Sequence, residues 1–137
     1  MNNELYTEQK PQPIVSADAS PREIAEAVVS VLDSKKARNI KLLHVEAQTS
    51  IADYFVLCTG NSRTQVRSLI DEVEYKLSLS GIMPHHVEGV DASGWMLLDF
   101  GAVIVHVFSR EAREFYNLEK LYAETSEEDI SALISED

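Results

Sequence analysis

The chain has 137 residues, 45% of them hydrophobic, which is enough for one domain built around one core. Its formal net charge of -11 argues against unaided binding to nucleic acid, which depends on lysine and arginine neutralising phosphates, so we expect little direct nucleic-acid contact and a basic partner. The single cysteine excludes an intramolecular disulfide, and without a signal peptide or a membrane-length apolar run we expect a cytoplasmic protein with no membrane partner.

The first helix is predicted from its N-terminal signature. Residues 1–19 show no apolar period and include two prolines, so they are interpreted as a flexible leader. Ser20 can then cap a helix, Pro21 suits its first position, and Glu23 completes a capping box. Apolar residues recur at helical spacing after that point, which predicts an amphipathic helix to about Ser34.

Two strands and a second helix are predicted next. Residues 39–45 and 54–59 are apolar runs of strand length. The residues from Ser62 to Gln65 form a second capping box, which leads into apolar residues at helical spacing. This helix should end near Gly81, because glycine readily takes the left-handed conformation of a helix terminus.

Three further strands and a last helical segment complete the predicted domain. Residues 84–88, 95–99 and 103–108 are strand-like, and the short turn at 100–102 implies an antiparallel hairpin. A helix or pair of helical turns follows over 110–122. Its expected apolar side consists of Phe115, Leu118, Leu121 and Tyr122. The predicted fold class is α/β, with a mixed sheet of about five strands flanked by helices.

The C-terminal segment differs from the rest in charge. Residues 123–137 hold six acids and no base, whereas seventeen acids and twelve bases remain elsewhere. We therefore divide the chain into a leader at 1–19, an α/β domain at 20–122 and an acidic tail at 123–137. Apolar residues at helical spacing in the tail are compatible with a weak helix, and disorder is equally compatible with its composition.

Patterns that could support catalysis or metal binding are sparse. The Thr59–Ser62 segment lies where a strand leads into a helix and could hold a phosphate, but it lacks the Walker lysine, so a plain turn is the preferred interpretation. No Asp-x-Asp pair is present to hold catalytic magnesium, and the four histidines lack metal-ligand spacing. Cys58 follows an apolar strand residue and is expected to be a packed thiol. We expect no cofactor and no metal.

Aromatic residues gather around the last hairpin and the helical segment after it. Trp95, the only tryptophan, lies close in sequence to Asp99 and Gly101, and Phe115 and Tyr116 follow. Large amphipathic side chains of this kind often anchor protein interfaces. They also fill cores between a helix and a sheet, and the sequence alone leaves both interpretations open.

Six collinear motifs point to a family. They are ADYFV at 52–56, TGNS at 59–62, VEG at 87–89, GWMLLDFG at 94–101, VIVHVF at 103–108 and REFYNLEKL at 113–121. Together they resemble the Iojap/RsfS family of ribosomal silencing factors, over about residues 20–122. The resemblance implies an α/β fold related to nucleotidyltransferases but without their catalytic carboxylates.

The resemblance also implies a function without catalysis. A family member would bind the large ribosomal subunit through ribosomal protein uL-fourteen, sterically block the joining of the small subunit, and so repress translation under nutrient limitation. The free protein would be able to form a homodimer. The positions that match the family's contact surface are Glu88, Trp95, Asp99, Gly101, Tyr116, Glu119, Leu121 and Tyr122.

Individual roles follow from these positions by analogy. Trp95 would be an apolar anchor, Asp99 and Glu119 would pair with basic groups of the partner, and Gly101 would permit a tight turn. Tyr122 stands where family members usually have tryptophan, so the packing or contact at that end is open.

Two other functions compete with the ribosomal one. The first is a small nucleotidyltransferase-like enzyme that uses the turn at 59–62 for phosphate, which predicts saturable binding of nucleotide and magnesium. The second is an adaptor of similar fold with another basic partner, which predicts recovery of non-ribosomal proteins alone.

Overall fold

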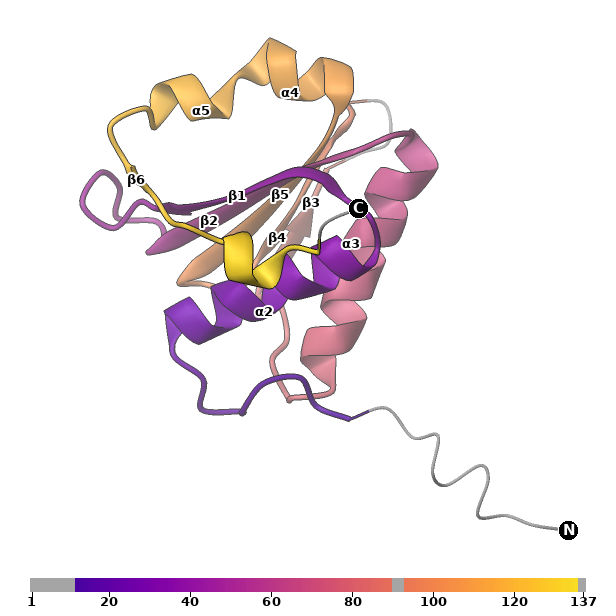
Figure 1. The fold of residues 1–137 in the computed structure, drawn as a ribbon, viewed down its shortest axis with the longest axis vertical. Helices are drawn as coiled ribbons and strands as arrows, with labels where there is room; N and C mark the ends of the chain where they lie inside the picture. Colours follow the sequence, from indigo (N-terminus) through magenta and orange to yellow (C-terminus); the bar gives the residue numbers. More distant parts are fainter. Residues whose placement is uncertain (1–11, 90–92, 136–137) are drawn as a thin grey trace, which may run out of the picture.

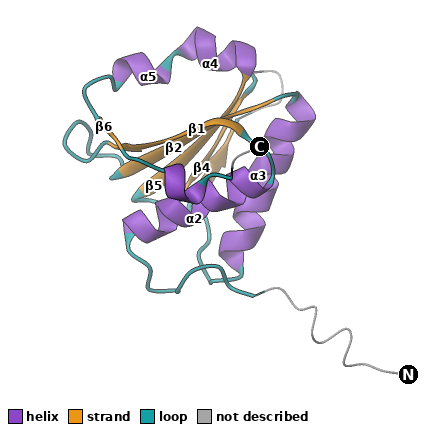
Figure 2. Ribbon diagram, viewed as in Figure 1, coloured by secondary structure: helices purple, strands orange, loops and turns teal. Residues whose placement is uncertain are grey.

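The computed structural model describes residues 12–89 and 93–135, which form a mixed sheet with helices on both faces (Figures 1 and 2). This confirms the predicted α/β class, and the sheet has six strands in the order β3-β4-β5-β2-β1-β6. Asp91 and the last two acidic residues of the tail lie outside the described residues. Within the described parts of the chain, no helix is both long and apolar enough to cross a membrane.

The first described helix, α2 (Pro21–Ser34), begins with the predicted capping box. The Ser20 hydroxyl accepts a hydrogen bond from the Glu23 amide at 3.2 Å, and the Glu23 carboxylate accepts one from the Ser20 amide at 2.8 Å. Two backbone donors that the helix itself leaves without partners are therefore satisfied. The buried side of α2 consists of Ala25, Val28, Val29, Val31 and Leu32.

Strands β1 (Arg38–His44) and β2 (Tyr54–Gly60) pair antiparallel, and α3 (Arg63–Ser78) follows β2. The second capping box is only half formed. The Ser62 hydroxyl accepts from the Gln65 amide at 3.0 Å, but the Gln65 side chain accepts from the amide of Asn61 rather than from that of Ser62. The helix ends near Gly81 as predicted, and the φ of Gly81 is 77°.

Strands β3 (His86–Glu88), β4 (Trp95–Asp99) and β5 (Val103–Ser109) form an antiparallel unit that contains the predicted hairpin. Strand β5 also pairs with β2, and this pair is parallel. The sheet is therefore mixed, and β2 and β5 lie at its centre. Both are almost entirely buried, as expected for strands that helices cover on both faces.

The last helical segment is broken into α4 (Arg110–Tyr116) and α5 (Leu118–Leu121). The break lies at Asn117, whose backbone is left-handed with a φ of 49°. Asparagine tolerates this conformation better than most other residues. The chain therefore turns at Asn117, and α4 and α5 follow each other end to end over the same face of the sheet (Figure 1).

The segment that the sequence assigned to an acidic tail returns to the domain. Strand β6 (Ser126–Glu127) pairs with β1, and the 3-10 turn η2 (Ser131–Leu133) follows it. The Arg22 guanidinium binds the Glu128 carboxylate at 2.7 Å, and apolar residues around η2 pack against the core. Figure 1 shows this segment in yellow, crossing the edge of β1 and lying on α2. The acidic composition of this segment gives no indication of these long-range contacts, so the sequence did not predict them.

The sheet separates two groups of buried side chains. One cluster lies between the sheet and α2 with α3, and it includes Cys58, which is fully buried. Burial raises the pKa of the Cys58 thiol to about 12, as expected for the predicted packed cysteine. The second cluster lies on the face that α4 and α5 cover, and it includes Phe55 and Phe108. The candidate contact residues belong mostly to this second face.

Candidate partner-binding surface

Trp95 links the sheet to α4. It lies opposite Phe108 across the β4–β5 pair, and the two rings are stacked with their centroids 5.1 Å apart. The ring of Tyr116 on α4 lies 4.7 Å from the Trp95 ring. Trp95 is half-buried, so one part of the indole packs in the molecule and the rest is accessible. The structure therefore shows Trp95 partly packed against the second cluster, and its contact with a partner stays a prediction.

His106 holds the indole of Trp95 through a hydrogen bond. The indole N–H of Trp95 donates to Nδ1 of His106 at 3.3 Å, so His106 must be neutral and carry its proton on Nε2. Burial lowers the pKa of His106 to about 3, which favours the neutral form. Nε2 has no hydrogen-bond partner among the described residues. His106 is thus a buried structural residue of β5.

Asp99 and Gly101 form the hairpin turn at the other end of β4. The Asp99 carboxylate accepts a hydrogen bond from the Gly101 amide at 2.7 Å, and the φ of Gly101 is 90°. A side chain at position 101 would be strained in this conformation, in agreement with the role expected for Gly101. Asp99 lies four residues along β4 from Trp95, a distance of about 13 Å in a strand. The structure therefore does not bring this pair next to Tyr116.

Glu88 lies on the edge strand β3, opposite Leu97 of β4. Its carboxylate lies within hydrogen-bond distance of Nε2 of His86, and its side chain is 59% exposed. Glu88, Gly89, Trp95 and Leu97 line a shallow cavity of about 190 Å³. Glu88 and Trp95 are therefore close enough to contact the same partner.

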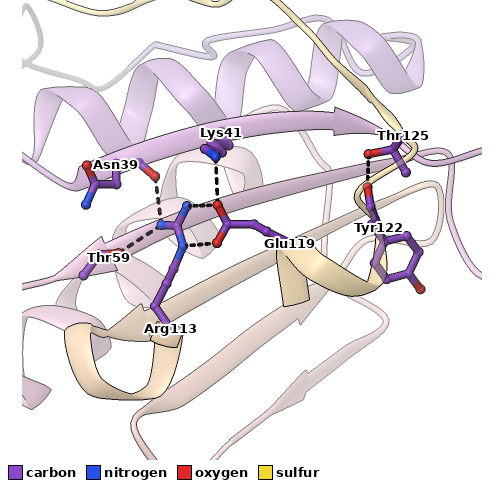
Figure 3. Close-up of polar contacts among 7 residues, drawn as sticks. All are labelled: Asn39, Lys41, Thr59, Arg113, Glu119, Tyr122 and Thr125. Atoms are coloured by element: carbon purple, nitrogen blue, oxygen red, sulfur yellow. Dashed lines mark hydrogen bonds and ion pairs between the residues drawn. The ribbon is translucent and has the colours of Figure 1, made fainter. Parts of the chain in front are cut away.

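Glu119 is engaged within the chain. Its carboxylate receives two hydrogen bonds from the Arg113 guanidinium, at 2.9 and 3.2 Å, and it pairs with Lys41 at 2.9 Å (Figure 3). Arg113 also donates to the backbone carbonyl of Asn39 and to the hydroxyl of Thr59, at 2.8 and 2.9 Å. These cations, Arg113 first, lower the pKa of Glu119 to about 2. Glu119 thus holds α5 against β1 in this structure.

Tyr122 packs inward at the end of α5. Its ring meets the ring of Phe55 edge to face, with the centroids 4.9 Å apart. Its backbone carbonyl accepts a hydrogen bond from the Thr125 hydroxyl at 2.7 Å, as Figure 3 shows. Tyrosine is smaller than the tryptophan that family members usually have at this position, yet Tyr122 packs against the second cluster. The sequence left open whether residue 122 packs or contacts a partner, and the structure shows that it packs.

The exposed apolar surface of α4 and α5 consists of Phe115, Tyr116 and Leu121. Their exposed fractions are 80%, 40% and 76%. The predicted apolar side of this segment was partly wrong, because Leu118 and Tyr122 pack on the second cluster while Phe115 and Leu121 do not. A helix or a pair of helical turns was predicted, and the structure shows two short helices with a left-handed residue, Asn117, between them. This break changes the direction of the side chains that follow it, Leu121 among them.

Phe115 does not belong to the contact positions that the family resemblance gave, and the sequence left open whether it lies in the core or at an interface. The structure shows it as the most exposed of the large apolar side chains in the described residues. Its ring contacts that of Tyr116 with the centroids 5.0 Å apart. Asn117, a residue favoured at helix breaks, was the signal in the sequence for the end of α4, and it does not place Phe115 itself. In the described parts of the chain, no group of three or more His, Cys, Asp or Glu residues is placed to hold a metal ion.

Comparisons with known proteins agree on one family. Residues 18–137 match the family model described as "Ribosomal silencing factor during starvation". The chain is 37% identical over 109 residues to the ribosomal silencing factor RsfS of Bacillus subtilis, which covers 80% of this chain and 92% of that protein. It is 33% identical over 111 residues to the mouse protein "Mitochondrial assembly of ribosomal large subunit protein 1", covering 79% of this chain and 49% of that protein.

A solved structure is similar as well. A crystal structure of a protein from Chromobacterium violaceum superposes with a TM-score of 0.73 at 30% sequence identity. The match covers 77% of this chain and 88% of that chain. The family model also includes the segment from 123 to 137, which carries β6 and η2.

Proposed function

We propose that this chain, which belongs to the ribosomal silencing factor family, binds the large ribosomal subunit and prevents the small subunit from joining. The proposed partner protein is uL-fourteen, and the proposed effect is repression of translation under nutrient limitation. The mouse relative is named for assembly of the large ribosomal subunit, which supports a partner on that subunit. The factor acts by occupying space, and the names of its relatives are regulatory rather than enzymatic.

The observation that carries this proposal is the exposed apolar surface of Phe115, Tyr116 and Leu121. Large aromatic and aliphatic side chains at this degree of exposure are characteristic of binding surfaces, because they lose contact with water when a partner covers them. Trp95 supports this surface from beneath, through its contact with Tyr116. The aromatic part of the surface, Phe115 and Tyr116, is therefore supported before a partner arrives, which reduces the entropy lost on binding.

Charge supports a basic partner for this surface. The chain carries a net charge of -11, and Glu88 and Glu114 are exposed near its aromatic residues. Complementary charge speeds encounter and orients docking. Glu119 contributes less than the sequence implied, since Arg113 and Lys41 already neutralise it. For Glu119 to pair with a basic group of the partner, that group would have to displace Lys41.

The proposal is tested by sedimentation with separated bacterial subunits. Wild type should travel with the large subunit and reduce the fraction of joined ribosomes, whereas a Phe115→Ala/Leu121→Ala variant should bind at least about tenfold more weakly. The matched control is Tyr75→Ala, which removes an aromatic side chain that is 47% exposed on α3. A wild-type protein that stays at the top of the gradient would contradict the proposal.

The identity of the partner protein has a test of its own. Titration of purified uL-fourteen should show saturable binding to wild type and to Tyr75→Ala, with binding lost in the double variant. If the chain travels with the large subunit but does not bind isolated uL-fourteen, the partner assignment is wrong while the ribosomal function stands. Sedimentation of the free protein at several concentrations tests the proposed homodimer. If dimer formation and subunit binding exclude each other, the dimer contact and the subunit contact use the same surface.

A further inference from the structure

A polar cavity of about 630 Å³ lies between the start of β1, the end of β2 and α4, and we propose that it binds a phosphate group. Its lining comes from β1, the end of β2 and α4, and consists of Arg38, Asn39, Thr59, Asn61, Arg110, Arg113 and Glu114. The sequence drew attention only to the turn after β2. The proposal adds a ligand site to the proposed docking function and does not depend on it.

The cavity lies at a switch point of the sheet. Strands β2 and β5 are parallel neighbours, and Gly60 at the end of β2 lies opposite Ser109 at the end of β5. From there β2 leads into α3, which packs on the first cluster, whereas β5 leads into α4, which packs on the second. The two connections leave toward opposite faces, as Figure 1 shows. In α/β sheets ligands bind in the crevice that such a divergence leaves.

The charge of the cavity is opposite to that of the chain. Three of the six arginines of this acidic protein line it, against one carboxylate, that of Glu114. The side chains of Arg38 and Arg110 are exposed, and their guanidinium groups have no hydrogen bond or ion pair with any described residue. Two unpaired guanidinium groups facing one crevice repel each other unless an anion lies between them. An anionic ligand therefore suits this cavity.

Arg113 forms the fixed wall of the cavity. Its side chain is 12% exposed, and its bonds to Asn39, Thr59 and Glu119 hold it in one orientation. Because the Thr59 hydroxyl accepts from Arg113, its own hydrogen is available to a ligand. We therefore assign ligand contact to Arg38 and Arg110, with Arg113 as a positioning residue.

The chemistry of the lining selects the phosphate group rather than a whole nucleotide. A guanidinium group binds phosphate oxygens through two parallel hydrogen bonds, which gives both strength and orientation. The lining contains no aromatic or aliphatic side chain on which a base could stack. The phosphate can be a free anion, or it can belong to an RNA backbone presented at the docking surface, which begins on the same helix at Phe115.

The first arm of the test is an NMR titration of the full chain with inorganic phosphate and with pyrophosphate, at constant ionic strength. We expect saturable shifts at Asn61 and its neighbours in wild type and their loss in an Arg38→Gln/Arg110→Gln variant. Both side chains are exposed, so the variant should remain folded. The control variant, Lys36→Gln/Lys76→Gln, has the same change in charge outside the cavity and should keep the shifts.

The second arm measures binding to the large subunit at several salt concentrations. If the phosphate belongs to RNA, the arginine variant should lower the slope of log affinity against log salt by about 1 to 2 relative to the control, since each phosphate contact contributes about 0.7 to 0.9. If free phosphate gives saturable NMR shifts, the ligand is a small anion. If free phosphate gives no shifts but the arginine variant has a lower salt slope, the phosphate belongs to RNA.

The proposal is overturned if free anions leave the spectrum of wild type unchanged and the two variants show equal salt slopes on the subunit. That outcome would leave the docking proposal intact, because wild type would still bind the subunit. If wild type does not bind the subunit at all, the docking proposal fails. The phosphate titration alone then tests whether the cavity binds phosphate.

Discussion

The two faces of the sheet are closed in different ways. Among the described residues, twenty buried side chains form the cluster under α2 and α3, whereas eight form the cluster under α4 and α5. The first face is held by apolar packing of two long helices. The second depends on a short broken helix whose Arg113–Glu119 pair binds Asn39 and Lys41 of β1, and it leaves aromatic side chains exposed. The face with the smaller core is thus the one that can present a binding surface.

The largest effect on stability should come from a cavity in the first face. Leu69 on α3 is 1% exposed, and Leu69→Ala should lower the free energy of unfolding by about 2 to 5 kcal/mol. Chemical denaturation followed by circular dichroism measures the change. A loss below about 1 kcal/mol would mean that the first face is more plastic than its packing indicates.

Removing Arg113 should weaken the second face selectively. Arg113→Ala leaves Glu119 without its main partner and the Thr59 hydroxyl without a donor, so we expect a loss of about 2 to 3 kcal/mol. Hydrogen exchange should accelerate in α5 and the adjacent part of β1 more than in α3. Arg110→Ala serves as the control, because its side chain is exposed. Uniform acceleration throughout the molecule would show that the two faces do not open independently.

A pH effect should be traceable to His106. Its pKa is lowered to about 3 in the folded protein, so the unfolded chain binds its proton first as the pH falls below about 6.5. The stability that this group contributes is complete above that pH and is lost progressively toward pH 3, by at most about 1.4 kcal/mol per pH unit.

The variant His106→Phe should lack this contribution. Denaturant midpoints at pH 5 and pH 7.5 should differ less in the variant than in wild type. Fluorescence of Trp95, the only tryptophan, should also change because its indole loses its acceptor. An equal midpoint difference in both proteins would show that His106 takes up its proton without unfolding.

The smallest effect should follow truncation of the exposed surface. Phe115→Ala alone should alter the free energy of unfolding by no more than about 0.5 kcal/mol, since the side chain is 80% exposed. Thermal unfolding compared with wild type measures it. A loss above about 1 kcal/mol would show that Phe115 supports the fold, and the binding surface would then have to be redrawn.

Local patterns in the sequence determined the elements of this protein. Capping residues placed the start of α2, strand-length apolar runs placed β2, β4 and β5, and glycine placed the end of α3. These features depend on neighbours along the chain, so they can be recognised without the fold. The collinear motifs also identified the family, which the comparisons confirm.

Contacts between distant residues were decided only by the tertiary structure. The acidic tail supplies β6 because its backbone pairs with β1, more than eighty residues earlier, and composition carries no record of that pairing. The Glu119 carboxylate forms ion pairs within the chain because the turn at Asn117 brings it close to Arg113 and Lys41. Arg38 and Arg110 meet in one cavity only because β1 and β5 are two strands apart in the sheet. Charge and hydrophobicity along the chain describe each residue singly, whereas these sites depend on which strands lie side by side.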